Sequence, residues 1–306
     1  MGGCTSTCSS NVTINPENGQ GMTQEPCPKD VVSVYRYNPA YISSNIRTEL
    51  HRWMSRVKYS KRVHERLGGD LNLDEISTRG NITGRTILHD LVVFGTLKDM
   101  KRVIEAGIDV NMADNVGETP LFLAAWLGSP EKVNTLLAAN ADLAVANEVD
   151  MTPLIAAAES GSLLVVDLLI KARANVNAAA SGAVTALMLA AQLGHEAIVE
   201  TLISGKANVN ARDEDGYTPL IHAQAQKGVK IVDTLIAAQA DIQIRDMSGR
   251  SVLCFSSCNG NDAIVRHLLA AKAKIDVSGS DGETALAAAQ RLGHGTVVTI
   301  LSAATD

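Results

Sequence analysis

Residues 117–121 read Gly-Glu-Thr-Pro-Leu, and variants of this pentapeptide recur along the chain at a constant interval. The hydroxyl residue inside it returns every 33 residues without a slip, at Thr86, Thr119, Thr152, Thr185, Thr218, Ser251 and Thr284. A hydroxyl residue that recurs at a fixed period of this length indicates a repeated structural unit. The array of these units therefore determines the fold.

Each unit predicts two helices. Nine or ten residues after each hydroxyl comes a glycine, which separates two apolar stretches rich in Ala and Leu. Glycine suits a helix end because it accepts positive φ without a Cβ clash. Thr followed by Pro suits a helix start, because the hydroxyl caps free N–H groups and proline loses no hydrogen bond at the first helical position. The second stretch ends in a turn such as Arg-Ala-Asn-Val-Asn at 173–177. We therefore expect helix, tight turn, helix and extended turn in every unit.

This frame resembles the ankyrin repeat in its length, in its Gly-x-Thr-Pro-Leu opening, in the Gly-His step at 194–195 and 293–294, and in its closing Asp/Asn-Val-Asn. Seven units cover about residues 81–306, roughly three quarters of the chain. The resemblance implies an all-α solenoid of paired antiparallel helices with β-turn fingers, which presents a concave surface to other proteins.

Two departures from the family pattern predict local changes. The family's histidine two residues after the proline is present only as His89, so its backbone hydrogen bonds must be absent or replaced in the other units. The fifth unit carries its glycine one place late, at Gly228, and recovers register before Leu235. We expect a small distortion of the first helix or its turn in that unit.

The composition excludes some classes of function. Aromatic residues are 3% of the chain while Ala dominates the repeats, which suits closely packed thin helices and argues against a large ligand-holding core. The net charge is −6, but residues 1–80 hold ten Lys and Arg against eight Asp and Glu, so the repeats carry the acidic excess. Binding to phosphates requires clustered Lys and Arg, so we expect no nucleic-acid partner.

Residues 1–44 are predicted to be a flexible leader, since much of the segment is rich in Ser, Thr, Asn, Gly and Pro. Its first six residues, Met-Gly-Gly-Cys-Thr-Ser, match the N-myristoylation pattern, in which Gly2 is acylated after Met1 is removed. Cys4 is then a candidate for palmitoylation, because one myristoyl chain anchors a protein only reversibly. The alternative is an unmodified tail. Because no secretory signal is found in the sequence, we expect the acylated protein to lie at the cytosolic face of a membrane.

Residues 45–80 are predicted to contain a basic helix that caps the first repeat. Apolar residues follow helical spacing on one face, and the other face is basic. The basic positions are Arg47, Arg52, Arg56, Lys58, Lys61, Arg62 and Arg66. Such a face suits anionic lipid or an acidic filament surface such as a tubulin tail. The segment 63–72 also imitates the repeat end at 103–111, which favours a terminal cap with a polar outer face. The two roles can coexist.

The sequence contains few residues in an arrangement that would support catalysis or metal binding. His89, His195 and His294 occupy frame positions near helix starts, where a structural role is expected. Cys254 and Cys258 lie on one helix and are interpreted as a core thiol and an exposed thiol, because a structural zinc site normally needs four ligands. The sequence implies no nucleophile next to a base. We therefore expect no enzyme, no metal and no cofactor.

The family resemblance also implies where a protein partner would bind, at the turn tips and the exposed side of each first helix. Carried over residue by residue, these positions include Arg85 and Glu118, and the principal candidates are Phe94, Trp126, Leu127, Met151, Gln192, Tyr217 and Arg250. Aromatic residues are scarce here, yet Phe94, Trp126 and Tyr217 fall at positions expected to face outward. Since interface energy concentrates in Trp, Tyr and Arg, they are candidate hot spots. The alternative is that Phe94 and Trp126 cover the adjacent repeat.

Together these observations predict a non-enzymatic adaptor that is tethered to a membrane and binds a protein on its concave face. The alternative is a structural component of a large cytoskeletal or ciliary assembly, with the leader and basic helix held by neighbouring proteins.

Overall fold

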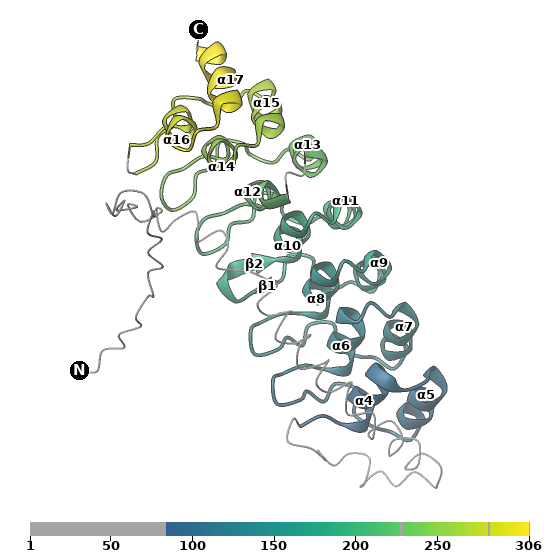
Figure 1. Cartoon of the computed structure of the whole chain (residues 1–306). Helices are drawn as coiled ribbons and strands as arrows, with labels where there is room; N and C mark the ends of the chain where they lie inside the picture. Colours follow the sequence, from purple (N-terminus) through teal and green to yellow (C-terminus); the bar gives the residue numbers. More distant parts are fainter. Residues whose placement is uncertain (1–83, 227–228, 281, 306) are drawn as a thin grey trace, which may run out of the picture. The chain divides into compact units, whose positions relative to one another are not determined.

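The computed structural model describes residues 84–226, 229–280 and 282–305. Within this part, seven helical pairs follow one another along the chain (Figure 1). The first helices of the pairs are α4 (Ile87–Phe94), α6 (Pro120–Trp126), α8 (Pro153–Ser160), α10 (Ala186–Leu193), α12 (Pro219–His222) with the 3-10 turn η3 (Ala223–Gln226), α14 (Val252–Cys258) and α16 (Ala285–Arg291). The second helices are α5 (Leu97–Glu105), α7 (Pro130–Ala138), α9 (Leu163–Lys171), α11 (Glu196–Ser204), α13 (Val229–Ala237), α15 (Asp262–Ala270) and α17 (Gly295–Thr305).

The first helices begin where the recurring hydroxyl predicts. The hydroxyl of Thr119 accepts a hydrogen bond from the N–H of Phe122 at 3.2 Å, which satisfies one of the free donors of the first turn. Proline follows as the first helical residue of α6, α8 and α12. At the other end, Gly161 and Gly194 close α8 and α10 with φ of 79° and 80°, in the left-handed region that glycine accepts best. The predicted helix boundaries are therefore confirmed for these units.

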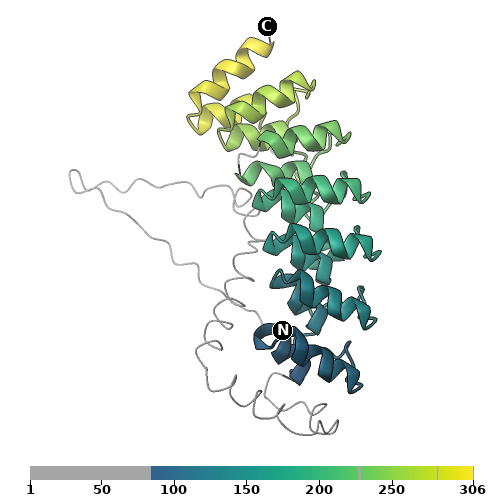
Figure 2. The same ribbon diagram turned by 90° about the vertical axis from the view of Figure 1, so that its right-hand side faces the viewer.

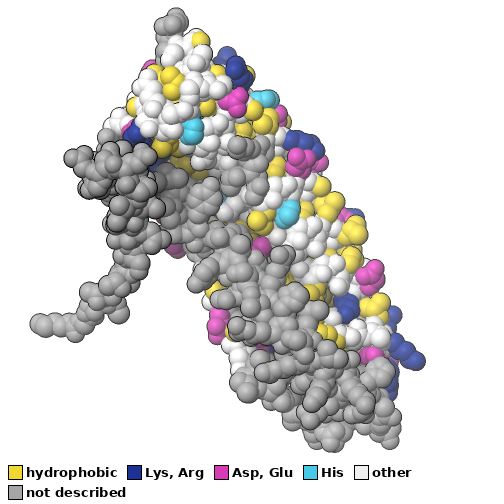
Figure 3. Space-filling view, viewed as in Figure 1, with side chains coloured by type: hydrophobic (Ala, Val, Ile, Leu, Met, Phe, Trp, Pro, Cys, Tyr) yellow, Lys and Arg dark blue, Asp and Glu magenta, His cyan; other side chains and the backbone are white. Residues whose placement is uncertain are grey.

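The pairs stack in chain order, with first helices against first helices and second helices against second helices (Figures 1 and 2). Alanines such as Ala124, Ala157 and Ala190 are fully buried in the first helices, where their small side chains let neighbouring helices approach closely. Along the second helices, acidic and basic side chains lie next to one another (Figure 3), as in the 2.7 Å ion pair of Lys230 with Glu196. The predicted all-α repeat solenoid is confirmed.

The loops between pairs form the expected fingers. In the finger that precedes α10, β1 (Ala179–Ala180) pairs antiparallel with β2 (Val184–Thr185) across a 3-10 turn. Neighbouring fingers also bond to each other, for example from the N–H of Glu148 to the carbonyl of Val116 at 3.1 Å. The fingers thus form a continuous edge that is held by backbone hydrogen bonds.

The fifth repeat shows the predicted distortion. Helix α12 spans only four residues and continues as η3, whereas α10 in the fourth repeat spans eight. By sequence, Lys227 stands where Gly194 closes the fourth first helix. A residue with a Cβ makes the left-handed closure costlier, which accounts for the difference.

The predicted leader (1–44) and basic segment (45–80) lie outside the described residues, so the domain boundaries stay a prediction. The same holds for the acylation sites Gly2 and Cys4 and for the basic positions from Arg47 to Arg66.

Candidate protein-binding surface

An apolar edge lies at the ends of α4 and α6, the first helices of the first two repeats. Phe94 is the last residue of α4 and is 37% exposed, while Trp126 and Leu127 at the end of α6 are partly exposed. Phe94 and Leu127 occupy the same frame position in adjacent repeats, and α4 packs against α6. We call Phe94, Trp126 and Leu127 the aromatic edge. Phe94 is exposed as predicted, Trp126 and Leu127 are half-buried, and a role of the three side chains in partner binding stays a prediction.

A lysine from the second repeat binds the end of α4, which carries Phe94. Helix α4 ends at Gly95 with φ of −83°, without the left-handed closure seen in later repeats. Instead, the amine of Lys132 in α7 donates to the carbonyls of Val92 at 2.6 Å and Leu91 at 3.4 Å. Partial burial lowers the pKa of this amine. The end of α4 that carries Phe94 is therefore fixed against α7.

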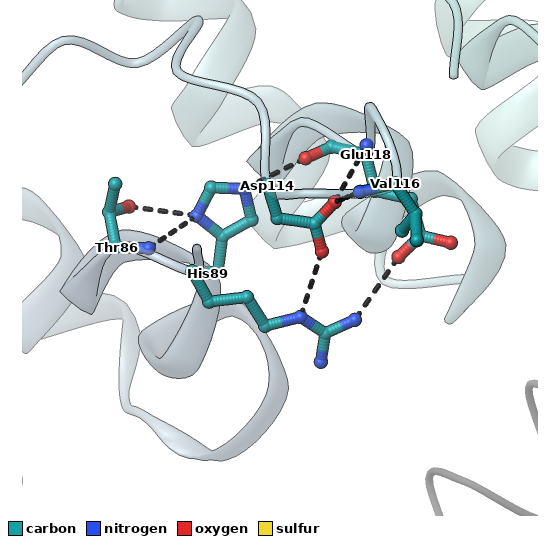
Figure 4. Close-up of polar contacts among 6 residues, drawn as sticks. Thr86, His89, Asp114, Val116 and Glu118 are labelled. Atoms are coloured by element: carbon teal, nitrogen blue, oxygen red, sulfur yellow. Dashed lines mark hydrogen bonds and ion pairs between the residues drawn. The ribbon is translucent and has the colours of Figure 1, made fainter. Parts of the chain in front are cut away.

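A charged cluster joins the base of the first repeat to the finger of the second (Figure 4). Arg85 donates from Nε to Asp114 Oδ2 at 3.0 Å and from its terminal nitrogen to Glu118 Oε2 at 3.1 Å. The other oxygen of Asp114 accepts the backbone N–H groups of Val116 and Glu118, both at 3.0 Å. Both carboxylates are buried, so this cluster is a structural clamp and not a free surface.

Burial shifts the protonation of this cluster. One guanidinium is shared by two carboxylates, and desolvation together with the charge of Asp114 raises the pKa of Glu118 from 4.5 to about 7. Burial also lowers the pKa of His89, which stays neutral. Its Nδ1 accepts the N–H of Thr86 at 3.1 Å, so Nε2 carries the proton and donates to the carbonyl of Glu118 at 2.9 Å. The imidazole thereby links the first repeat to the second.

Three of the predicted partner-binding side chains are not exposed. Met151, Gln192 and Tyr217 are 4%, 7% and 3% exposed, so the expectation that they face outward was wrong. The ring of Tyr217 packs edge-on against Phe255, with ring centres 5.3 Å apart. The loop that carries it folds against the next repeat, and this longer-range packing overrides the frame position. A role of these residues in binding is untested.

Arg250 is engaged within the chain. Its guanidinium forms an ion pair with Asp246 at 2.8 Å and lies 4.7 Å from the ring centre of Phe255. It also donates to the hydroxyl of Tyr217 at 3.4 Å. These contacts join the fifth and sixth fingers, and a role of Arg250 in partner binding stays a prediction.

The histidines of the Gly-His steps have the expected structural role. His195 and His294 each place Nε2 near a carbonyl of the preceding repeat, Glu159 at 3.4 Å and Cys258 at 2.9 Å. The contacts of His89 are replaced elsewhere in various ways, for example by the sulfur of Met188, which accepts the N–H of Thr185 at 3.4 Å.

The remaining titratable and thiol side chains of the described residues do not form a second site. No three His, Cys, Asp or Glu side chains of this part are grouped as a metal site would require. Cys254 is buried and Cys258 half-buried, both as free thiols, and their mutual hydrogen bond raises the pKa of Cys254 and lowers that of Cys258. None of the described helices combines the length and apolar character needed to cross a bilayer.

The sequence model for ankyrin repeats, which spans three copies, matches the chain at 55–147, 88–180, 128–213, 154–246 and 224–306. These matches cover most of the chain, which therefore belongs to the ankyrin-repeat family. No curated protein matched the sequence. Ankyrin repeats generally mediate protein–protein interaction, and they are typically non-enzymatic.

Proposed function

We propose that this protein is a non-enzymatic adaptor that binds a protein partner through its first helices and fingers, with the aromatic edge as the energetic centre. The exposure of Phe94 beside Trp126 carries the proposal, because the chain has few aromatic residues and places two of them on adjacent helix ends. Large aromatic side chains dominate the energy of most interfaces. Lys132 bonds the end of α4 that carries Phe94, and an anchor that is ordered before binding lowers the entropic cost of binding.

We further propose that acylation of Gly2 and Cys4 tethers the adaptor to the cytosolic face of a membrane. The support is the sequence pattern of residues 1–6, together with the basic positions between Arg47 and Arg66. A lipid chain and a basic patch together anchor a protein more firmly than either one alone.

The aromatic edge is tested by comparing Trp126→Ala with Leu292→Ala. Leu292 is 38% exposed and follows the first helix of the last repeat, at the frame position of Leu127, so it is a matched control in a distant repeat. Partners captured by the wild type and by Leu292→Ala should bind Trp126→Ala more weakly by about 2 kcal/mol or more. The melting curve of Trp126→Ala should stay close to that of the wild type. Equal binding, or a collapsed melting curve, would discard the aromatic edge as a hot spot.

The tether is tested by separating cells into soluble, membrane and detergent-insoluble fractions for the wild type, Gly2→Ala and Cys4→Ser. Loss of membrane recovery in both variants supports acyl anchoring. Retention of all three proteins in the detergent-insoluble fraction would instead favour a structural role in a cytoskeletal or ciliary assembly.

A further inference from the structure

A row of side-chain amides crosses from repeat to repeat just after the second helices. Asn111 Oδ1 accepts the N–H of Asp142 at 2.8 Å, and Asn177 Oδ1 accepts the N–H of Asn208 at 2.7 Å. The same bond recurs from Asp241 to Asn210 at 2.8 Å and from Lys274 to Gln243 at 3.4 Å. We call these contacts amide rungs, and each bridges 31 residues of sequence.

Two of the rungs use both ends of the carboxamide. Asn177 Nδ2 donates to the carbonyl of Lys206 at 3.3 Å, and Gln243 Nε2 donates to the carbonyl of Lys272 at 3.1 Å. A single amide group therefore satisfies an N–H and a C=O of the next repeat, two residues apart in sequence. The chain itself thus shows how a carboxamide is bound at this place.

One rung is missing, between the second and third repeats. The position equivalent to Asn111 and Asn177 is Ala144, which has no amide to offer. Among the described residues, neither the N–H of Asn175 nor the carbonyl of Arg173 forms a hydrogen bond, and both residues are exposed.

A groove of about 690 Å³ opens at this place. Its walls come from the end of α7 with the following loop and from the loop after α9, and they include Leu137, Ala144, Thr152, Arg173 and Asn175. The groove is therefore lined by both apolar and polar residues, and it contains the unused N–H and C=O of a vacant rung.

We propose that this groove is a binding site for the primary carboxamide of an Asn or Gln side chain on a protein partner. Such a group presents its oxygen and one N–H on the same side, so it can accept from Asn175 and donate to Arg173 as the rungs do. A trans peptide group points its N–H and C=O in opposite directions and satisfies only one of the two. A carboxylate lacks the donor and an ammonium lacks the acceptor. The inference does not depend on the aromatic edge or on the membrane tether.

The test follows amide chemical shifts of the full chain while acetamide, a primary carboxamide, is added. The N–H of Asn175 should shift in a saturable way, while the N–H of Asn208, whose rung is filled by Asn177, should shift only with the bulk solvent. N-methylacetamide, a trans secondary amide of similar size, should produce a much weaker saturable shift at Asn175. Parallel and non-saturating shifts of Asn175 and Asn208, or equal responses to the two probes, would overturn the proposal.

Two substitutions sharpen the test within the same frame. Ala144→Asn places a carboxamide in the vacant rung, as Asn or Gln does at the equivalent position of four other repeats. The response of the Asn175 N–H to acetamide should then disappear. Asn177→Ala empties a filled rung, so a saturable response should appear at Asn208. If Ala144→Asn keeps the full response at Asn175, the site has been assigned wrongly.

Discussion

The fourth and fifth repeats share one sequence frame, yet they are held together differently. Helix α10 of the fourth repeat is a complete helix in which Ala190 and Ala191 are fully buried. In the fifth repeat the position of Ala191 is taken by Gln224, which is also buried and donates to the carbonyl of Leu220 at 3.0 Å. Its side-chain oxygen accepts from Ser256 at 2.7 Å.

The difference shows that a repeat can replace apolar packing by buried hydrogen bonds and still keep the 33-residue pattern. Packing needs only volume, whereas buried polar groups must each find a partner. In the fifth repeat one does not, since His222 Nδ1 lacks a hydrogen-bond partner among the described residues. The fifth repeat is therefore expected to be the less stable of the two.

The largest effect should come from removing the same leucine in each repeat. Leu187 and Leu220 are equivalent in the frame, and each is 1% exposed. Leu187→Ala should lower the free energy of unfolding by about 3 kcal/mol or more, because a well-packed site cannot collapse around the cavity. Leu220→Ala should cost about 1 kcal/mol less, since the short α12 can adjust. Urea titration measures both, and equal losses would show that the two interiors are equally well packed.

The next largest effect is a pH dependence of the free energy of unfolding. It is expected for the charged cluster around Glu118, whereas the neutral hydrogen bonds of Gln224 do not depend on pH. The pKa of Glu118 is raised in the folded state, so between 4.5 and about 7 the folded protein holds a proton that the unfolded chain has lost. Stability from this group is therefore lost as pH rises through that window, by on the order of 3 kcal/mol at most. His89 acts in the opposite sense, because its lowered pKa costs stability as pH falls.

Glu118→Gln isolates the first effect, since the amide oxygen can still accept from Arg85 and does not titrate. Between about pH 5 and about pH 8, the wild type should lose stability relative to this variant in urea titrations. A constant difference across that range would contradict the assigned pKa shift of Glu118.

A smaller effect is expected for the polar contact that distinguishes the fifth repeat. Gln224→Ala should cost about 1–2 kcal/mol, because buried polar groups, including the hydroxyl of Ser256, lose a partner. Adding Ser256→Ala should recover part of this loss. In the preceding repeat, Ala already stands at the position equivalent to each residue, Ala191 for Gln224 and Ala223 for Ser256. A double-mutant cycle measures the coupling, and strict additivity of the two changes would argue that the 2.7 Å contact contributes nothing.

The smallest effect concerns the end of the fifth first helix. The double change Lys227→Gly with Gly228→His restores the Gly-His sequence of the fourth repeat. It should stabilise the chain by about 1 kcal/mol, because glycine closes a helix in the left-handed region without strain. Calorimetry would show a higher melting temperature, and Gly194→Lys with His195→Gly is the matched reverse change. If both double variants melt at the wild-type temperature, the glycine position does not explain the short α12.

Part of the candidate site could be read from the sequence. The exposure of Phe94 was predictable because the end of a first helix has a fixed place in the frame. The burial of Tyr217 and Glu118 was not, because it depends on Phe255 and Arg85, which lie in neighbouring repeats. The vacant rung had a signal in the sequence, the Ala144 that interrupts a row of Asn and Gln, but its meaning required the bonds of the other rungs.

The sequence alone determined the helix starts, most helix ends and the register of the array, because hydroxyl caps, N-terminal prolines and left-handed glycines act on their immediate neighbours. Only the tertiary structure decided which side chains of adjacent repeats meet, as in the clamp of Arg85 and the groove beside Ala144. Those contacts join residues about one repeat apart, and their geometry depends on how each pair of helices packs on the next.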